Sequence, residues 1–195
     1  MHHQSLNHSL RHFNGFFPQL GPRVFIDRSA TVIGDVQIGD DSSIWPQTVM
    51  RGDMHRIRIG ARTSIQDGTI CHITHAGPHN PEGFALTVGD DCTIAHGVIL
   101  HGASIGNCVL IGMGSIVMDG AIIDDNVVVG ANSLVPPNKH LASGFLYTGS
   151  PARAVRALSA KELAYFTYSA SNYCRLKDQY LAEDQASASA AADAG

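Results

Sequence analysis

Charged residues are scarce in this chain of 195 residues: they make up 15% of it, against roughly 25% in an average soluble domain. The 17 Asp and Glu outnumber the 13 Lys and Arg, so the formal charge is −4 at pH 7. The chain has no excess of basic residues, so its charge gives no support for nucleic acid or an anionic membrane surface as a partner. No apolar run approaches the roughly 18 residues that span a bilayer. A surface so poor in charge indicates burial against another subunit, and we expect an oligomer.

Cysteine is sparse as well, and its spacing fits no metal motif. Cys71, Cys92, Cys108 and Cys174 lie too far apart for a CxxC pair, so we interpret them as thiols of a reducing cytosol. The first 18 residues lack the continuous apolar stretch of a secretory signal. Only Arg11 is charged among the first 22 residues, which disfavours a mitochondrial transit segment. The sequence therefore predicts a cytoplasmic protein.

The chain is organised by a period of six residues, which fits neither an amphipathic helix nor a flat strand. Aliphatic residues, with one Met and one Cys, recur at every sixth position in four phased runs. The runs are Ile26 to Met50, Ile59 to Cys71, Val88 to Leu100 and Ile105 to Val135. A small or β-branched residue usually stands four positions after each of them, and Gly often follows directly. This pattern is the hexapeptide repeat of parallel β-helices.

The repeat predicts a triangular prism in which six residues form one side and about 18 residues form one coil. The aliphatic residue points inward, the small residue fits near a corner, and Gly is expected to supply the unusual turn dihedrals. The repeat is interrupted by a charged insert at 51–58 and by a loop at 74–87. An all-β sandwich with chance spacing is the alternative, and so many in-phase apolar positions disfavour it.

The sequence predicts an all-β fold, a single-stranded parallel β-helix followed by one C-terminal α-helix. Ser159 and Glu162 have the spacing of a capping box at the start of that helix. The residues after it are mostly Ala, Ser, Asp and Gln, a composition typical of disorder. The expected parts are an N-terminal segment at 1–13 that need not be ordered, the β-helix at 14–157, the helix at 158–181 and a disordered tail at 182–195.

Three of the 11 histidines stand out by their place in the repeat. His72 and His101 each follow an inward residue and lie 29 residues apart, of which the 74–87 loop contributes 11 beyond phase. The remaining 18 residues make one coil, so the two imidazoles should lie one above the other, about one strand spacing apart. His96 belongs to the previous side of the prism, and a neighbouring subunit related by a threefold axis could supply it.

Three histidines with one open coordination position are typical of a catalytic metal site. The absence of carboxylate ligands favours Zn²⁺, with Fe²⁺ or Co²⁺ as alternatives, over magnesium or calcium. The competing interpretation is that these are surface histidines without a shared ligand, which is the commoner case for any single histidine. The one-coil register of His72 and His101, with His96 nearby, favours the metal site.

The motifs of this chain closely resemble those of the gamma-class carbonic anhydrase-like family, in its bacterial hexapeptide-repeat branch. The resemblance covers roughly residues 14–181, and its motifs are Arg51-Gly52-Asp53, Ile65-Gln66-Asp67-Gly68, His72, His96-Gly97 and His101-Gly102. It implies a homotrimer of left-handed β-helices, with one metal at each subunit interface held by the three histidines named above.

The resemblance also implies roles for residues around the metal. Arg51 and Asp53 correspond to an ion pair across the interface, which trimer assembly alone would require. Gln66 corresponds to a residue that hydrogen-bonds the metal-bound water, although a polar ladder between coils is the alternative. Asp67 corresponds to a residue that lines the site. Tyr168, on the C-terminal helix, is a candidate for the pocket mouth, unless the tyrosines of that helix simply pack it.

The sequence departs from the active members of the family at two positions. Glutamates that relay protons there are replaced here by Met54 and His75. Met54 cannot carry a proton, whereas His75 could, because imidazole titrates near neutral pH. This departure predicts slow turnover.

The function implied is the reversible hydration of CO₂ to bicarbonate by a metal-bound hydroxide at the trimer interface. A three-histidine site lowers the pKa of zinc-bound water to about 7, a value taken from carbonic anhydrases in general rather than from this sequence. Three alternatives stay open: a thioester hydrolase, a hexapeptide acyltransferase-like protein, and a non-catalytic metal-binding trimer. A CoA-dependent transferase needs one basic histidine and gains nothing from three.

Overall fold

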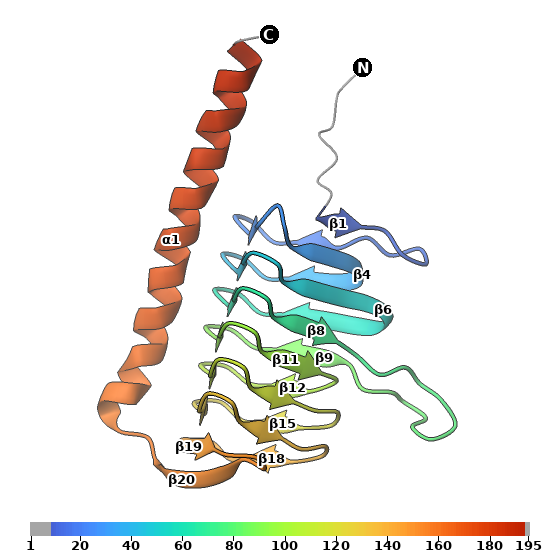
Figure 1. Ribbon diagram of the computed structural model, residues 1–195, viewed down its shortest axis with the longest axis vertical. Coiled ribbons are helices and arrows are strands. Elements are labelled where there is room, and N and C mark those ends of the chain that lie inside the picture. The colour runs from blue at the N-terminus through green and yellow to red at the C-terminus, as the bar shows by residue number, and fades with distance from the viewer. Residues whose placement is uncertain (1–8, 194–195) are drawn as a thin grey trace.

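The computed structural model describes residues 9–193, and it shows a β-helix with one long helix along its side (Figure 1). Two strands are long and bend around a corner of the prism, namely β4 (Thr31–Ile38) and β6 (Val49–Ile59). The other strands are short, and each belongs to one of three faces. Parallel pairing between successive coils, as in β4 with β6, builds each face.

The first face contains the N-terminal halves of β4 and β6 together with β1 (Leu10–Arg11), β8 (Ile70–His72), β11 (Ile99–His101), β14 (Ile116–Val117) and β17 (Leu134–Val135). The second face contains their C-terminal halves together with β2 (Gln19–Leu20), β9 (Leu86–Val88), β12 (Ser104–Ile105), β15 (Ile122–Ile123) and β18 (His140–Leu141).

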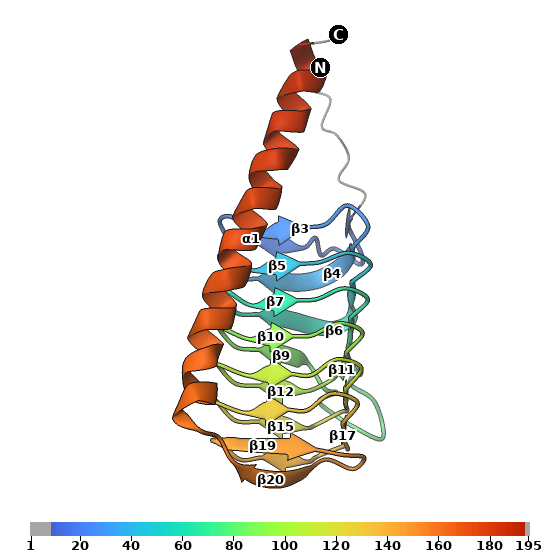
Figure 2. The same ribbon diagram turned by 60° about the vertical axis from the view of Figure 1, so that its left-hand side comes forward.

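The third face is the helix-covered face. It contains β3 (Phe25–Ile26), β5 (Ser43–Ile44), β7 (Ser64–Ile65), β10 (Thr93–Ile94), β13 (Leu110–Ile111), β16 (Val128–Val129) and β19 (Phe145–Thr148). The last strand, β20 (Arg153–Ala157), pairs antiparallel with β19 and closes that end of the prism. The path from this face to the first face and back along the second gives the β-helix its left hand (Figure 2).

The core is the column of inward residues that the six-residue period predicted. Every predicted inward position is buried except Ile26, which is half-buried. Ile44, Ile65, Ile94 and Ile111 stack in register along the helix-covered face, each fully buried. These inward residues form one continuous cluster along the axis of the prism.

The glycines that follow inward residues do not have the turn dihedrals that the sequence analysis expected, and that explanation was wrong. Positive φ is found instead at later corner residues such as Asp41 and Asp91. A Cβ on Gly39 would lie 2.6 Å from the backbone carbon of Gly60, and one on Gly60 would lie 2.4 Å from that of Gly89. These glycines therefore permit the close stacking of one coil on the next.

The charged insert at 51–58 is no loop. It forms the centre of β6, which runs through the corner and pairs with β4 on both faces. The extra residues are absorbed by a register shift between Gly34 and Val36. The predicted loop does leave the prism and projects beside the first and second faces (Figure 1), but it is shorter than 74–87, because Leu86 and Thr87 belong to β9 and pair with β6.

The N-terminal boundary lies earlier than predicted, because β1 pairs with β4 and Leu10 is opposite Val32. The hydroxyl of the buried Ser9 donates to the carbonyl of Asp27 at 3.2 Å. Residues 9–13 therefore belong to the first coil, and residues 1–8 of the predicted N-terminal segment lie outside the described residues.

Helix α1 (Ala160–Asp193) begins at the predicted capping box. The amide of Ser159 donates to Glu162 at 2.9 Å, and the amide of Glu162 donates to the Ser159 hydroxyl at 3.3 Å. The helix continues to Asp193, so the prediction of a disordered tail is wrong for 182–193. Alanine, frequent in this stretch, is the strongest helix former, and Arg28 pairs with Asp184 at 2.6 Å. Residues 194 and 195 of the predicted tail lie outside the described residues.

Two kinds of contact hold α1 on the prism. Trp45 packs against Tyr173 and Tyr180 with ring centroids 6.1 and 5.3 Å apart. The side chain of Lys177 is fully buried, and its Nζ lies 2.9 Å from Asp41. Burial alone would raise the pKa of Asp41, but the hydrogen bonds and charges of Lys177 and Arg23 together outweigh it and the pKa is lowered. Within residues 9–193, no helix combines the length and the apolar character needed to cross a membrane.

Candidate metal centre

His72 and His101 lie one above the other, as the sequence predicted. They are register partners in β8 and β11, one coil apart. Nδ1 of His72 lies 3.1 Å from Nε2 of His101, and the ring centroids are 5.1 Å apart. Both side chains point outward from the first face, because each follows a fully buried inward residue.

The other ring nitrogen of each histidine is held by a carboxylate. Nε2 of His72 lies 3.2 Å from Asp53, and Nδ1 of His101 lies 2.7 Å from Asp119. The second oxygen of Asp119 accepts from the hydroxyl of Thr74 at 2.9 Å. Carboxylates in this position orient metal-binding imidazoles and fix which nitrogen faces the metal.

Asp119 and Thr74 are site residues that the sequence analysis missed. Asp119 follows His101 by 18 residues, which is one coil. That spacing was available in the sequence. The spacing alone did not indicate a role for Asp119, because an Asp on the surface of the next coil is common, and only the structure shows its contact with the imidazole.

The fit of a metal between the two histidines follows from their spacing. Two nitrogens bound to one zinc at about 2.0–2.1 Å in tetrahedral geometry lie roughly 3.4 Å apart. The observed 3.1 Å between Nδ1 of His72 and Nε2 of His101 is close to that value. The pKa of His72 is lowered, first by burial and then by the charge of Arg51. The neutral imidazole, which is the metal-binding form, is therefore favoured.

His96 lies apart from this pair, at the corner between β10 and β11. Its Nδ1 is 2.9 Å from Asp67, so it too has a carboxylate partner, and its side chain is 53% exposed. Within residues 9–193 of a single chain, no three His, Cys, Asp or Glu side chains come together as a metal-binding group. The third ligand must therefore come from another copy of the chain if three histidines share one metal.

Arg51 and Asp53 form an ion pair within one chain, whereas the sequence analysis placed it across an interface. Burial would raise the pKa of Asp53, but the hydrogen bonds from Arg51 and His72 lower it. The Arg51 side chain is 45% exposed. A further contact of Arg51 with a neighbouring subunit stays a prediction.

Gln66 is buried and lines a hollow of about 350 Å³ between α1 and the helix-covered face, with His96 in the wall of the same hollow. Its Nε2 has no hydrogen-bond partner among the described residues. Tyr165 and Tyr173 line the hollow from the helix. The predicted residue Tyr168 does not line it: the side chain is 60% exposed and lies against Tyr165.

His75 and Met54 are both exposed. His75 lies on the projecting loop, and no hydrogen bond or ion pair joins it to the histidine pair in the described part of the chain. Its predicted role as a proton carrier therefore stays a prediction.

The first face has an outward column of aliphatic side chains beside the histidine pair. Its members are partners in successive coils and are partly or largely exposed: Val49, Ile70, Ile99, Ile116 and Leu134. Ile70 and Ile99 each lie two residues before a predicted metal ligand, so both side chains point from the same face as the imidazoles. An exposed apolar surface of this kind marks an interaction site.

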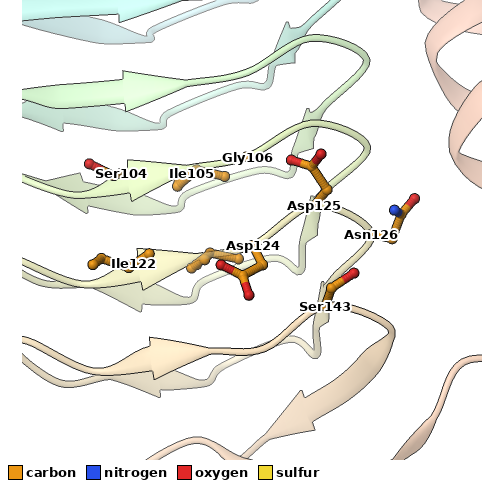
Figure 3. A pocket seen from close by; sticks show the side chains of 9 residues that line it. Ser104, Ile105, Gly106, Ile122, Asp124, Asp125, Asn126 and Ser143 are labelled. Atoms are coloured by element: carbon orange, nitrogen blue, oxygen red, sulfur yellow. The ribbon is translucent and has the colours of Figure 1, made fainter.

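Another hollow, of about 660 Å³, lies on the second face and is shown in Figure 3. Ser104, Ile122, Asp124, Asp125 and Ser143 are among the residues that line it. None of the predicted site residues belongs to its lining. This hollow is therefore separate from the candidate metal centre.

Comparisons with known proteins agree with the repeat and with the fold. The family model described as bacterial transferase hexapeptide (six repeats) matches residues 17–52 and 102–137. The chain is 58% identical to Protein YrdA of Escherichia coli over 172 residues, which cover 88% of this chain and 94% of that protein.

A plant relative and a solved structure extend the comparison. The chain is 36% identical to mitochondrial gamma carbonic anhydrase 2 of Arabidopsis thaliana over 187 residues, or 95% of this chain and 66% of that longer protein. The crystal structure of a hexapeptide transferase family protein from Anaplasma phagocytophilum superposes with a TM-score of 0.83 at 38% identity. The superposition covers 90% of this chain and 99% of the Anaplasma chain.

Proposed function

Because this chain belongs to the gamma-class carbonic anhydrase-like family, in its bacterial hexapeptide-repeat branch, we propose that it is a metal-dependent enzyme that hydrates CO₂ reversibly. The site would lie between two subunits of a homotrimer, with Zn²⁺ held by His72 and His101 of one subunit and His96 of the next. Fe²⁺ and Co²⁺ suit the same ligands.

The histidine pair carries this proposal. Two imidazole nitrogens lie 3.1 Å apart in hydrogen-bond contact, at about the spacing that two ligands of one metal would have, and each ring is anchored through its other nitrogen by a carboxylate. His96 has the same arrangement with Asp67. A carboxylate partner alone does not mark a ligand, because the exposed His140 has one in Asp124. What supports the proposal is that three such anchored histidines are candidate ligands of one site, since carboxylates of this kind fix the tautomers of metal-binding imidazoles.

The aliphatic column on the first face supports a second copy of the chain as the partner. It has the chemistry of an interface core, which is apolar and poor in charge. Closed cyclic symmetry would bring the corner residue His96 of one subunit to the first face of the next. Each of the three interfaces would then complete one site.

When bound, the metal would supply a Lewis acid that makes water a nucleophile near neutral pH. The chain's own residues would do the rest. The unpaired Nε2–H of Gln66 would donate to an oxygen of CO₂ or bicarbonate and orient it. Asp53 and Asp119 would keep His72 and His101 in their binding tautomers. With methionine at 54 and an exposed histidine at 75, proton release would depend on His75 or on buffer, so turnover would be slow.

An acyltransferase-like function is the second candidate, since the matching family model and the Anaplasma neighbour are both described as hexapeptide transferases. A thioester hydrolase would use the same metal site on a carbonyl substrate. A trimer that binds metal without catalysis is the last alternative. Of these candidates, only the transferase needs no metal bound by three histidines. A measurement of the metal content of the protein therefore distinguishes it from the others.

Subunit mixing tests the shared site directly. The His96→Ala variant lacks one ligand at every interface, and the double variant His72→Ala, His101→Ala lacks two. Any trimer that mixes them has one interface with all three histidines. We therefore expect neither variant to retain metal alone and mixed trimers to bind about one ion each. Wild-type metal content in His96→Ala, or a monomer in solution, would contradict the proposal.

Catalysis needs its own measurement. Protein loaded with zinc, or with iron in the absence of oxygen, should accelerate CO₂ hydration in stopped flow, and the His96→Ala variant should not. A metal-replete trimer with no rate above buffer would remove the carbonic anhydrase function and leave the non-catalytic alternative.

A further inference from the structure

The hollow beneath α1 exists because one column of side chains shrinks from coil to coil. The residues directly after the inward positions of the helix-covered face stack in the order Trp45, Gln66, Ala95, Gly112 and Gly130. The indole of the first fills the space under the helix, whereas the glycines leave it open. With coils about 4.8 Å apart, the groove runs roughly 14 Å from Gln66 to Gly130.

The walls of this groove are largely apolar. Leu110 and Val128 are register partners in β13 and β16, and both line it from the prism. Met113 lines it at the corner, and Tyr165 and Tyr173 line it from the helix. A slot of this kind suits an aliphatic chain, because burying methylene groups is favourable and needs no partner.

One polar group lies at the upper end of the groove without a partner. Gln66 is 3% exposed, and its Nε2 makes no hydrogen bond in the described residues. The nearby amide does partly oppose the rise that burial causes in the pKa of Tyr173, so the hydroxyl of Tyr173 is the nearest alternative partner, beyond hydrogen-bond distance. Leaving a buried donor unpaired costs about 1–3 kcal/mol. A ligand oxygen in the groove would remove that cost. His96 lies in the same wall.

We propose that this groove binds a short, unbranched acyl group, with its carbonyl or carboxylate oxygen on Gln66 Nε2 and its chain running toward Gly130. The inference rests on the metal centre of the proposed function, because the metal shared through His96 would then lie at the polar end of the groove, and the acyl oxygen would take the place on Gln66 that CO₂ or bicarbonate has there. It names a substrate class larger than CO₂. The groove has a volume of about 350 Å³. A water molecule, which also has three atoms, takes about 30 Å³ in the liquid, so the groove is many times larger than a molecule of three atoms needs.

The test is a titration of the full-length protein, freed of metal by chelation, with acetate, butyrate, hexanoate and octanoate in a calorimeter. Affinity should rise by about fourfold for each methylene group that enters the groove. The Gln66→Leu variant should bind all four acids about tenfold more weakly, because it loses a hydrogen bond to a charged group.

The matched pair of variants is Val128→Phe and Ile122→Phe. Both residues are outward-facing aliphatics, but only Val128 lines the groove, whereas Ile122 lies on the second face. Val128→Phe should abolish the dependence on chain length, and Ile122→Phe should leave it unchanged. Circular dichroism and gel filtration check that both variants fold and assemble as the wild type does.

The outcomes separate this inference from the proposed function. Equal affinity for acetate and octanoate, or unchanged octanoate binding by Val128→Phe, overturns the acyl site even if the protein binds metal through its three histidines. Binding that rises with chain length in a protein that takes up no metal supports the groove and removes the metal centre.

Discussion

Replacing Asp119 tests whether the carboxylates behind the histidines set the affinity of the metal. Asp119 lies 2.7 Å from Nδ1 of His101 and also accepts from Thr74 at 2.9 Å. Without it, Nδ1 of His101 loses a hydrogen bond to a charged group, worth about 1.5–3 kcal/mol. Asp119→Ala should therefore raise the Kd for zinc by about 10- to 100-fold, the range found for such partners elsewhere.

Asp119→Asn should fall between Asp119→Ala and the wild type. The amide oxygen can still accept from Nδ1 of His101, but a hydrogen bond between neutral groups is about half as strong as a charge-assisted one. The order of the three affinities therefore reports on the hydrogen bond itself rather than on the volume of the side chain.

Zinc affinity would be measured by competition with a chromogenic chelator. The control is Asp124→Ala, because Asp124 lies 2.8 Å from His140 in a similar but more exposed pair far from the histidine pair. That variant should bind zinc as the wild type does. An unchanged Kd in Asp119→Ala, or an equal loss in Asp124→Ala, would refute the reasoning.

Three further variants probe assembly and stability. Ile99→Asp puts a charge in the centre of the aliphatic column and should give monomers in gel filtration, with metal binding lost. Asp41→Asn leaves the buried ammonium of Lys177 with one partner fewer and should cost up to about 3 kcal/mol in urea unfolding at pH 7. Because the folded pKa of Asp41 is lowered, its contribution is complete above the unfolded value of about 3.9 and is lost as the pH falls through the folded one. Ser159→Ala removes the cap of α1 and should cost about 1 kcal/mol.

Each of the three has an outcome that would contradict it. A trimer in Ile99→Asp would show that the aliphatic column is not the interface. Acid unfolding of Asp41→Asn as steep as that of the wild type would show that this carboxyl does not contribute to the pH dependence. Equal stability of Ser159→Ala would mean that packing alone determines where α1 begins.

The six-residue repeat is the feature that allowed the fold to be predicted from the sequence. A period of six residues is read directly from the chain, and each inward position is then fixed, since one residue in every six points into the prism. The same counting placed His72 over His101. Both predictions depend on position along the chain, which the sequence contains in full.

The ends of the elements were harder to predict from the sequence. Strand β1 and the last part of α1 lie outside the repeat; the sequence left the order of the first region open and predicted disorder for the second. Their order comes from partners distant in the sequence, such as Val32 for Leu10 and Arg28 for Asp184. Composition cannot show such partners.

The sequence by itself determined the β-helix, its inward columns and the vertical pairing of His72 with His101, because these depend only on spacing. Only the tertiary structure decided which groups lie around them: Asp119 behind His101, and the groove that opens where Gln66 gives way to glycine beneath α1. Those contacts depend on the lateral packing of side chains from different coils and from the helix. The spacing of residues along one chain does not fix that packing.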